Sequence, residues 1–193
     1  MTVLAEVIDA ITLERRIAEL GAEITEAYGD GDLVLLGVLN GSIPFLADLS
    51  RHLPTSVEID FLSLTRFGEK GRVGIAVDSG TPITDRHVLV VEDIVDTGLA
   101  LSSMRTLLET RRPASLATVT LLDKRPRRIV EVPLEYRGFE VGDEFLIGYG
   151  LDWEGRYRNV PSLWAVLDLL RFQEDPEGYA AEAFWSATDR LSG

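Results

Sequence analysis

The chain has 193 residues, 46% of them hydrophobic and 26% charged, which is ordinary for a soluble globular protein able to bury a sizeable core in one domain. Cysteine is absent, which excludes disulfides, zinc–thiolate sites and thiol catalysis, and a net charge of −13 argues against nucleic acid as a partner. No apolar stretch is long enough to span a bilayer and the N-terminus has no basic leader, so we expect a cytoplasmic protein with no membrane partner.

The chain begins with alternating helix and strand signals. Thr12 is the expected N-cap of a helix whose apolar positions repeat at helical spacing to about Tyr28. The apolar run at 33–39 is typical of a buried parallel strand, and the turn at 40–42 leads into a short helix that contains Phe45. This order predicts a strand–turn–helix unit.

A strand is also expected at 57–64, where apolar and polar residues alternate. The following segment, 65–84, is rich in glycine and charge, and we expect a mobile loop there or a two-stranded flap. The two histidines, His52 and His87, are expected on the surface.

The segment from Val88 to Ser102 is the most informative part of the sequence. An apolar run is followed by Glu92 and Asp93, then by Asp96, Thr97 and Gly98, and then by the spacing of an amphipathic helix. In a strand–turn–helix unit the helix N-terminus binds phosphate, and carboxylates at the strand end accept sugar hydroxyls or ligate a metal. The combination suits a phosphorylated sugar, although an ordinary strand end followed by a helix N-cap also carries such acids.

Another strand is expected at 115–123, followed by a cluster of basic residues at 124–128 and a second basic pair, Arg156 and Arg158. Beyond Pro126 the elements become shorter, and we expect two strands and a terminal helix at 129–132, 145–149 and 175–193. Strands that alternate with helices predict an α/β fold with a mostly parallel sheet, flanked by helices and completed by a small cap.

The order of residue types between Val88 and Gly98 resembles the motif with which type I phosphoribosyltransferases bind 5-phosphoribosyl pyrophosphate (PRPP). From about Val7 to about Leu163, six segments are similar to the bacterial hypoxanthine(-guanine) phosphoribosyltransferases: IAELGAEIT, VLNGSIPFLADL, VEIDFLSL, VLVVEDIVDTG, SLATVTLLDKRPRR and GFEVGDEFLIGYGLDWEGRYRNVP. The resemblance implies a purine-salvage enzyme that transfers 5-phosphoribose from PRPP to N9 of a 6-oxopurine, hypoxanthine or guanine. The products would be IMP or GMP and pyrophosphate, with Mg²⁺ as cofactor.

The resemblance also implies an architecture. It predicts the type I phosphoribosyltransferase fold in one domain over residues 1–193, with a core at about 13–128. A small cap, or hood, subdomain would come from about 1–12 and 129–175, and a helical tail from 176–193. Family members are commonly homodimers or homotetramers, so a homo-oligomer is expected.

For PRPP, the resemblance implies three groups of binding residues. Glu92 and Asp93 would hold the ribose hydroxyls, directly or through Mg²⁺. The backbone N–H groups of Thr97, Gly98, Leu99 and Ala100 would wrap the 5-phosphate, and Asn40, Gly41 and Arg158 would bind pyrophosphate. Asp96 would contribute to the same site and act near purine N7 as the catalytic acid/base, because an unperturbed aspartate, with a pKa of about 3.9, is ionised at neutral pH.

For the base, the resemblance implies a second set. Lys124 would donate to the 6-oxo group and oppose the 6-amino group of adenine, since an ammonium group has only donors. Phe145 would stack on the purine, and backbone carbonyls near Leu146 and Asp152 would accept from its edge. Glu92, Asp93 and Asp152 are the expected metal ligands.

Several positions depart from the usual family pattern. Asn40 replaces a common Lys or Arg, Ala100 replaces a threonine that usually contacts the 5-phosphate, and Arg66-Phe67 replaces a Ser-Tyr pair in a shortened loop. These departures keep open a protein that only senses PRPP or nucleotides, and an enzyme for xanthine or another purine. Related enzymes have a non-proline cis peptide at the turn that corresponds to Leu39-Asn40, which the sequence does not reveal.

Overall fold

The computed structural model describes residues 2–67 and 72–191. The chain forms two compact units, Ile17–Gly142 and a smaller one in which Met1–Arg16 joins Asp143–Gly193. Each unit contains its own β-sheet. Of the helices formed by the described residues, none is both long and apolar enough to cross a membrane.

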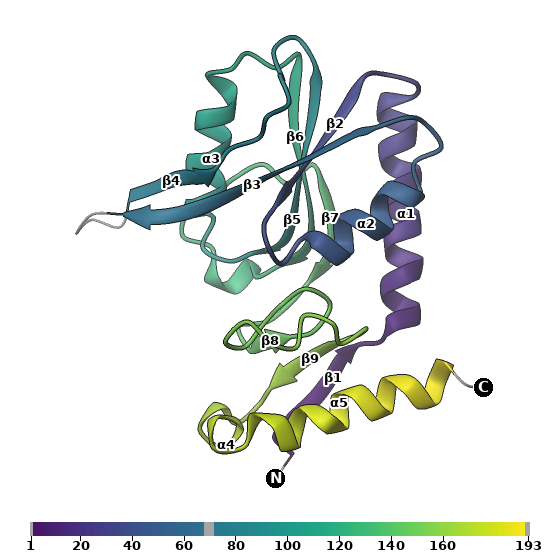
Figure 1. Ribbon diagram of the computed structural model, residues 1–193, viewed down its shortest axis with the longest axis vertical. Helices are drawn as coiled ribbons and strands as arrows, with labels where there is room; N and C mark the ends of the chain where they lie inside the picture. Colours follow the sequence, from purple (N-terminus) through teal and green to yellow (C-terminus); the bar gives the residue numbers. More distant parts are fainter. Residues whose placement is uncertain (1, 68–71, 192–193) are drawn as a thin grey trace. The chain divides into compact units, whose positions relative to one another are not determined.

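The larger unit is built on a six-stranded sheet, formed by β2 (Leu33–Val38), β3 (Glu58–Phe67), β4 (Arg72–Val77), β5 (His87–Val95), β6 (Ser115–Asp123) and β7 (Tyr136–Glu140). The strand order is β4-β3-β2-β5-β6-β7 (Figure 1). The pairs β3·β2, β2·β5, β5·β6 and β6·β7 are parallel, whereas β4 runs antiparallel to β3. The expected α/β fold with a mostly parallel sheet is confirmed.

Helices cover both faces of this sheet, which explains why the central strands are apolar throughout. Helix α3 (Leu99–Glu109) buries Leu101, Met104 and Leu108 against alternate residues of β2 and β5, among them Val34 and Val90. The intervening residues, such as Leu35 and Leu89, are also fully buried. In Figure 1, α2 (Ile43–Arg51) and the long α1 (Ala10–Tyr28) lie on the other side of the sheet from α3.

Helix α1 begins before the predicted cap. Its first residue is Ala10, and the side chain of Asp9 accepts hydrogen bonds from the backbone N–H of Thr12 at 2.9 Å and from its hydroxyl at 3.0 Å. The prediction that Thr12 is the N-cap is therefore wrong. Aspartate and threonine are both good caps, and the one at the true helix start accepts the free N–H of the first turn.

The flap alternative for 65–84 is confirmed in part, because β3 and β4 form an antiparallel pair that extends beyond the expected strand end at Leu64. Residues 68–71, between the two strands, lie outside the described part of the chain, as do the side chains of Arg66 and Phe67. The predicted mobility of this segment stays a prediction.

The strand expected at 129–132 is absent from the described structure. After β6 the chain makes a short 3-10 turn at Arg125–Arg127 and continues without regular structure to β7, which pairs with β6. The backbone N–H groups of Ile129 and Val130 bond instead to a single carbonyl, that of Thr97. β7 belongs to the larger unit, which ends at Gly142.

The smaller unit contains a three-stranded antiparallel sheet with the order β1-β9-β8, formed by Leu4–Ile8, Leu163–Val166 and Phe145–Ile147. The predicted strand at 145–149 is therefore shorter than expected. Helices α4 (Leu169–Glu174) and α5 (Pro176–Leu191) complete the unit, and Ala180 and Ala183 of α5 are buried in a cluster with residues of β1 and β9. The expected terminal helix is confirmed and packs on its own chain.

His52 is exposed, as predicted, but His87 is only partly so. Its Nδ1 lies 2.8 Å from the hydroxyl of Ser115, and its ring contacts Tyr28 edge to face, with centroids 5.7 Å apart. The prediction of a surface residue is wrong for His87, because the first residue of a central strand is flanked by its neighbours in the sheet.

Candidate active site

A pocket of about 140 Å³ lies at the carboxyl end of β5, where the chain turns into α3. Strand β5 runs to Val95, so Glu92 and Asp93 lie within it and not beyond its end, as the sequence had suggested. Neighbouring residues of a strand point to opposite faces. Accordingly, Glu92 lines the pocket and Asp93 does not; the other lining residues are Ile94, Val95, Asp96, Thr97, Gly98, Ala100 and Leu101.

The turn before α3 requires glycine at position 98. Gly98 has a φ of 82°, and a Cβ atom there would lie 2.3 Å from the carbonyl oxygen of Val130. The carbonyl of Thr97 accepts two hydrogen bonds of 3.0 Å, from the N–H groups of Ile129 and Val130. The turn is therefore fixed from behind. The N–H of Leu99 makes only a long hydrogen bond of 3.5 Å to the hydroxyl of Thr97, so the start of this 11-residue helix offers its N–H groups and its dipole to an anion.

Glu92 is the electrostatically unusual group of this pocket. Its side chain is buried, and among the described residues it has no hydrogen-bond donor. Burial, and to a smaller degree the charge of Asp93, raise the pKa of Glu92 well above its ordinary value. Asp93 is partly exposed and accepts a hydrogen bond of 2.9 Å from the N–H of Ile94. The two adjacent acids thus have different environments.

Asp96 and Lys124 lie on either side of the strand end. The carboxylate of Asp96 accepts a hydrogen bond of 2.7 Å from Nε of Arg127, and both side chains are about half exposed. Lys124 is mostly buried, and its backbone N–H bonds to the carbonyl of Val95 at 2.9 Å. The residues predicted for proton transfer and for the base thus directly follow two adjacent, hydrogen-bonded strands, β5 and β6.

The turn after β2 carries the residues predicted for pyrophosphate. The peptide bond between Leu39 and Asn40 is cis. Asn40 is exposed and Gly41 is buried, and the hydroxyl of the fully buried Ser42 donates to the carbonyl of Val38 at 2.7 Å.

In the smaller unit, the predicted stacking residue is accessible. Phe145 is 36% exposed, at one end of an edge-to-face aromatic series that continues through Trp153 to the fully buried Phe172. Leu146 is buried in the sheet beside it and pairs with Ala165. The ring of Phe145 is therefore held against Trp153 while part of its surface remains exposed.

Asp152 and Arg158 form an ion pair in the same unit, with Nη2 of Arg158 2.8 Å from Oδ1 of Asp152. The other oxygen of Asp152 accepts from the N–H of Gly155 at 2.7 Å, and Nη1 of Arg158 donates to the carbonyl of Gly150 at 2.6 Å. The sequence placed these two side chains in the site separately and missed their pairing.

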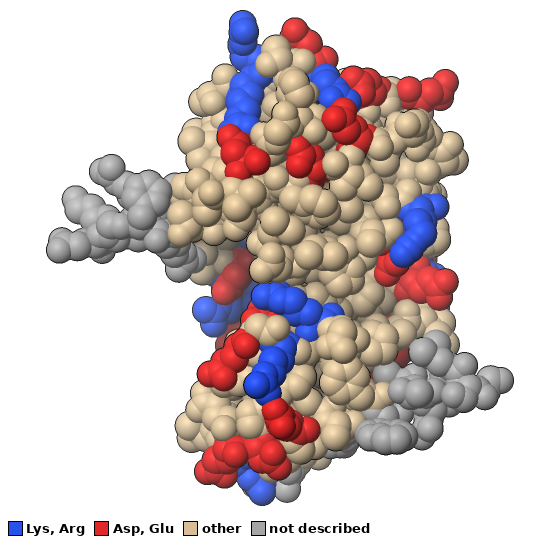
Figure 2. All heavy atoms as spheres, viewed as in Figure 1, with Lys and Arg blue, Asp and Glu red and all other residues tan. Residues whose placement is uncertain are grey.

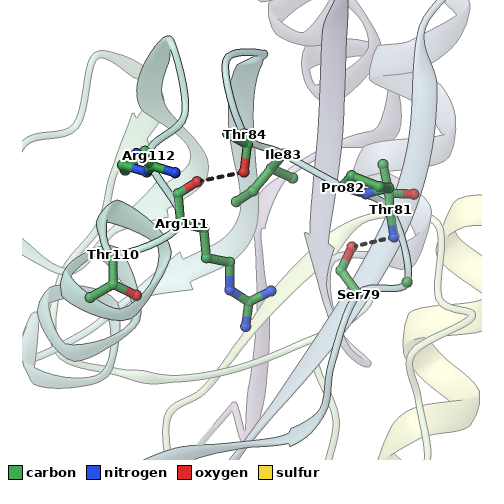
Figure 3. Close-up of a pocket in the computed structure, with 9 residues that line it drawn as sticks. Ser79, Thr81, Pro82, Ile83, Thr84, Thr110, Arg111 and Arg112 are labelled. Carbon is green, nitrogen blue, oxygen red and sulfur yellow. Dashed lines mark hydrogen bonds between the residues drawn. The ribbon is translucent and has the colours of Figure 1, made fainter.

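A second and larger pocket of the larger unit, about 440 Å³, lies between the segment after β4 and the end of α3 (Figure 3). It is lined by Ser79, Gly80, Thr81, Pro82, Ile83, Thr84, Thr110, Arg111 and Arg112. Several of its polar groups have partners: Arg111 makes two bonds of 2.8 Å to Asp78, and the hydroxyl of Thr84 bonds to the carbonyl of Arg111. No carboxylate of the described residues lines this pocket, whereas Glu92 and Asp96 line the smaller one.

Several arginines of the larger unit are paired with carboxylates. On the face shown in Figure 2, most of the surface is neither basic nor acidic, and the blue side chains lie next to red ones. Arg86, for example, bonds to Asp32 and Glu58, and Arg105 pairs with Glu135. The predicted basic cluster at 124–128 is also partnered, since Arg125, Arg127 and Arg128 each pair with a carboxylate.

A model of the phosphoribosyl transferase domain matches residues 5–154 of the chain. The chain belongs to this family. Hypoxanthine phosphoribosyltransferase of Escherichia coli K12 is 46% identical over 161 residues, which cover 80% of this chain and 90% of that protein. Hypoxanthine-guanine phosphoribosyltransferase of Bacillus subtilis is 42% identical over 153 residues, 77% of this chain and 85% of the relative.

Solved phosphoribosyltransferase structures are similar as well. The crystal structure of a hypoxanthine-guanine phosphoribosyltransferase from Bacillus anthracis superposes with a TM-score of 0.82 at 38% identity, covering 84% of this chain and 98% of that one. A hypoxanthine phosphoribosyltransferase from Staphylococcus aureus gives a TM-score of 0.83 at 36% identity, with coverages of 86% and 92%. The type I phosphoribosyltransferase fold expected from the sequence is confirmed.

Within each unit of this phosphoribosyltransferase, part of the predicted site is assembled. In the larger unit, Glu92, Asp96, Thr97, Gly98 and Ala100 line one pocket, whereas Asp93 and Leu99 are not among its lining residues. In the smaller unit, Asp152 contacts Arg158. The sequence missed Arg127 as the partner of Asp96, although it lies three residues after Lys124 in a cluster already recognised as basic.

The acids of the larger unit fit a metal that is shared with a substrate. Among the described residues, no three His, Cys, Asp or Glu side chains form a cluster able to hold a metal ion. Mg²⁺ commonly binds through one or two carboxylates together with substrate phosphates and water. Of the two adjacent acids only Glu92 lines the pocket, so the described residues of the larger unit offer carboxylates at this place singly and not as a metal cage made only of protein ligands.

Proposed function

We propose that this phosphoribosyltransferase transfers 5-phosphoribose from PRPP to N9 of a 6-oxopurine, hypoxanthine or guanine, and produces IMP or GMP and pyrophosphate. The names of its relatives support this reaction. The observation that carries it is the pocket at the end of β5, which combines a glycine turn at a helix N-terminus with a buried carboxylate. The cytoplasmic location and the homodimer or homotetramer expected from the sequence stay predictions.

PRPP binding is assigned mainly to the larger unit. The N–H groups from Thr97 to Ala100 receive the 5-phosphate, because a helix N-terminus offers donors and a favourable dipole without needing a cation. Glu92 and Asp93 accept the ribose 2- and 3-hydroxyls. A hydroxyl that donates to Glu92 lowers the free-energy cost of burying this carboxylate, for which the described residues provide no donor.

Pyrophosphate is assigned to the turn at Asn40-Gly41 and to Arg158 of the smaller unit. When bound, Mg²⁺ neutralises the charge of the departing pyrophosphate, and Glu92, Asp93 and Asp152 are the carboxylates we assign to it. Arg158 is held by Asp152 and by the carbonyl of Gly150, so its guanidinium has a defined orientation before any ligand arrives.

The base is assigned to Lys124, Phe145, Leu146 and Asp152. Lys124 donates to the 6-oxo group, and since it has no acceptor it opposes adenine. The open side of Phe145 stacks on the ring, and carbonyls near Leu146 and Asp152 accept from its edge.

Asp96 is the proposed acid/base. As the bond between the anomeric carbon and pyrophosphate breaks, the sugar gains oxocarbenium character and the incoming purine must redistribute a proton. N9 of the purine bonds to the anomeric carbon as pyrophosphate leaves with the electrons of the broken C–O bond, and the carboxylate of Asp96 accepts the proton that the purine releases at N7. Negative charge nearby stabilises the positive sugar.

The proposal is tested by nucleotide formation from PRPP and Mg²⁺ with hypoxanthine, guanine, xanthine and adenine in parallel. We expect turnover of hypoxanthine or guanine, none with adenine, and a fall in kcat of about 100-fold or more in Asp96→Asn, the size of effect typical of a lost acid/base. Preferred turnover of xanthine would change the substrate. PRPP binding without turnover of any base would contradict the proposal and favour a protein that senses PRPP.

A further inference from the structure

The segment from Lys124 to Val130, which we name the brace, contacts the chain on both sides of Asp96. We propose that Arg127 of this brace is a positioning residue for proton transfer: it holds one oxygen of the Asp96 carboxylate so that the other is presented to the purine. The inference rests on the acid/base role proposed for Asp96.

The contact itself is specific. Nε of Arg127 donates to Oδ1 of Asp96 at 2.7 Å, and no second donor to Asp96 occurs among the residues the structure describes. The side chains are 48% and 45% exposed. An ion pair this open to water contributes at most about 1 kcal/mol to the free energy of unfolding, so the pair does little to stabilise the fold. Its effect on the carboxylate's orientation does not depend on that small energy.

The backbone that carries Arg127 is held at both ends. The N–H of Lys124 donates to the carbonyl of Val95 at 2.9 Å, and the N–H groups of Ile129 and Val130 donate to the carbonyl of Thr97 at 3.0 Å. Val95 and Thr97 are the two neighbours of Asp96 in the chain. The brace therefore fixes the peptide groups that flank the proposed acid/base.

A buried ion pair anchors the middle of the brace. Arg128 pairs with Asp123, and their side chains are only 4% and 1% exposed. A Cβ atom at Gly98 would lie 3.2 Å from Nη1 of Arg128, so this guanidinium also lies directly behind the phosphate turn. Arg128 thus provides rigidity, whereas the exposed Arg127 points its Nε at the carboxylate.

The chemical consequence follows from the two oxygens of a carboxylate. Oδ1 is occupied by a donor that does not give up its proton, because a guanidinium stays charged at any working pH. Oδ2 is left to accept the proton that the purine releases. Holding the acceptor in one orientation before the reaction lowers the entropic part of the barrier, and such preorganisation affects turnover more than substrate binding.

The test compares Arg127→Gln with Arg125→Gln in the assay described above. Arg125 is a matched control, because it is an exposed arginine of the same brace that pairs with Glu131 at 3.1 Å and does not contact Asp96. We expect Arg127→Gln to lower kcat by about 10- to 50-fold while both KM values change less than about threefold, as for an interaction used mainly in the transition state. Arg125→Gln should keep both within about twofold, and Arg127→Lys should be intermediate.

A double-mutant cycle separates positioning from a general structural role. In the Asp96→Asn background, Arg127→Gln should lower kcat by less than about twofold, because the group it positions is already lost. Fully additive losses, or a raised KM at unchanged kcat, would overturn the inference. If Asp96→Asn is harmless in an active enzyme, the proposed acid/base fails as well; if only Arg127→Gln is harmless, the inference alone fails.

Discussion

Two pockets formed by described residues of the larger unit differ in size and in chemistry, and the smaller one contains the more unusual acid. The pocket beside α3's C-terminus, at 79–84 and 110–112, measures about 440 Å³, and the pocket at α3's N-terminus only about 140 Å³. Around the large one, Arg111 is neutralised by Asp78, and Asp60 accepts bonds from Ser79 and Thr81. The small one contains Glu92, buried and without a described donor.

This difference teaches that volume does not identify the site. Polar groups that the chain satisfies itself add to stability, whereas a buried carboxylate left without a donor costs stability and needs a ligand to offset the cost. The same sheet therefore carries Asp60, whose environment favours the ionised form, and Glu92, whose environment opposes it. Substitutions in the two pockets should have effects of different kind.

The largest difference between the two pockets is expected when a glycine of each is replaced by alanine. Gly98→Ala places a Cβ 2.3 Å from a carbonyl oxygen at a φ of 82°, so the turn to which we assign the 5-phosphate must move. We expect kcat/KM for PRPP to fall by about 100-fold or more, since small displacements of a positioning loop have effects of that order. Gly80→Ala in the large pocket meets nothing within 4 Å and is the control. Equal losses in both variants would remove the distinction between the pockets.

Glu92→Gln should make the ligand-free protein more stable while it weakens PRPP binding. Burial raises the pKa of Glu92 in the folded state, so ionisation opposes folding above the unfolded value of about 4.3, and the cost grows as the pH rises. We expect a gain of about 1–2 kcal/mol at pH 8 that shrinks toward pH 5. Urea unfolding at both pH values measures it. A destabilised variant at pH 8 would contradict this account of the pocket.

Asp60→Asn should have the opposite sign. Burial opposes ionisation of Asp60, but hydrogen bonds from Ser79, Phe61 and Thr81 outweigh it and lower its pKa to about 2. A depressed folded pKa adds stability that is present above the unfolded value of about 3.9 and is lost as the pH falls toward 2. We expect a loss of about 1–2 kcal/mol at pH 7, vanishing in acid, with KM for PRPP unchanged. A changed KM would link the large pocket to the reaction.

The sequence predicted the central elements well because their signals are local. The apolar run of β2, the helix α3 and the strand at 115–123 all have patterns that both faces of a parallel sheet require, and all were found where expected. The start of α1 was predicted wrongly because Asp9 and Thr12 are both favourable N-cap residues, and the sequence does not show which of them caps the helix. The strand expected at 129–132 failed because its N–H groups bond to Thr97, a partner more than 30 residues away.

The same limit applied to the site. The sequence grouped Glu92, Asp96 and Gly98 because they lie in one short segment, and the structure places all three in the lining of one pocket. The pairing of Arg127 with Asp96, and of Arg158 with Asp152, depends on how the chain folds back, and a run of basic residues does not specify which carboxylate each will meet. Nor did the sequence separate Glu92 from Asp93, because opposite faces of one strand give these neighbours different burial.

The smallest effect should sharpen the account of the small pocket. Ala100 lines it, at a position where the resemblance described above implies a threonine, and Ala100→Thr adds a hydroxyl donor for the proposed phosphate. A hydrogen bond to a charged group contributes at most about 1.5–3 kcal/mol, and threonine is less favourable than alanine in a helix, so we expect KM for PRPP to fall about fivefold. Ala100→Val has the same shape without the donor and should give no gain. If the two variants behave alike, volume and not hydrogen bonding controls this pocket, and the contrast with the larger one loses its physical basis.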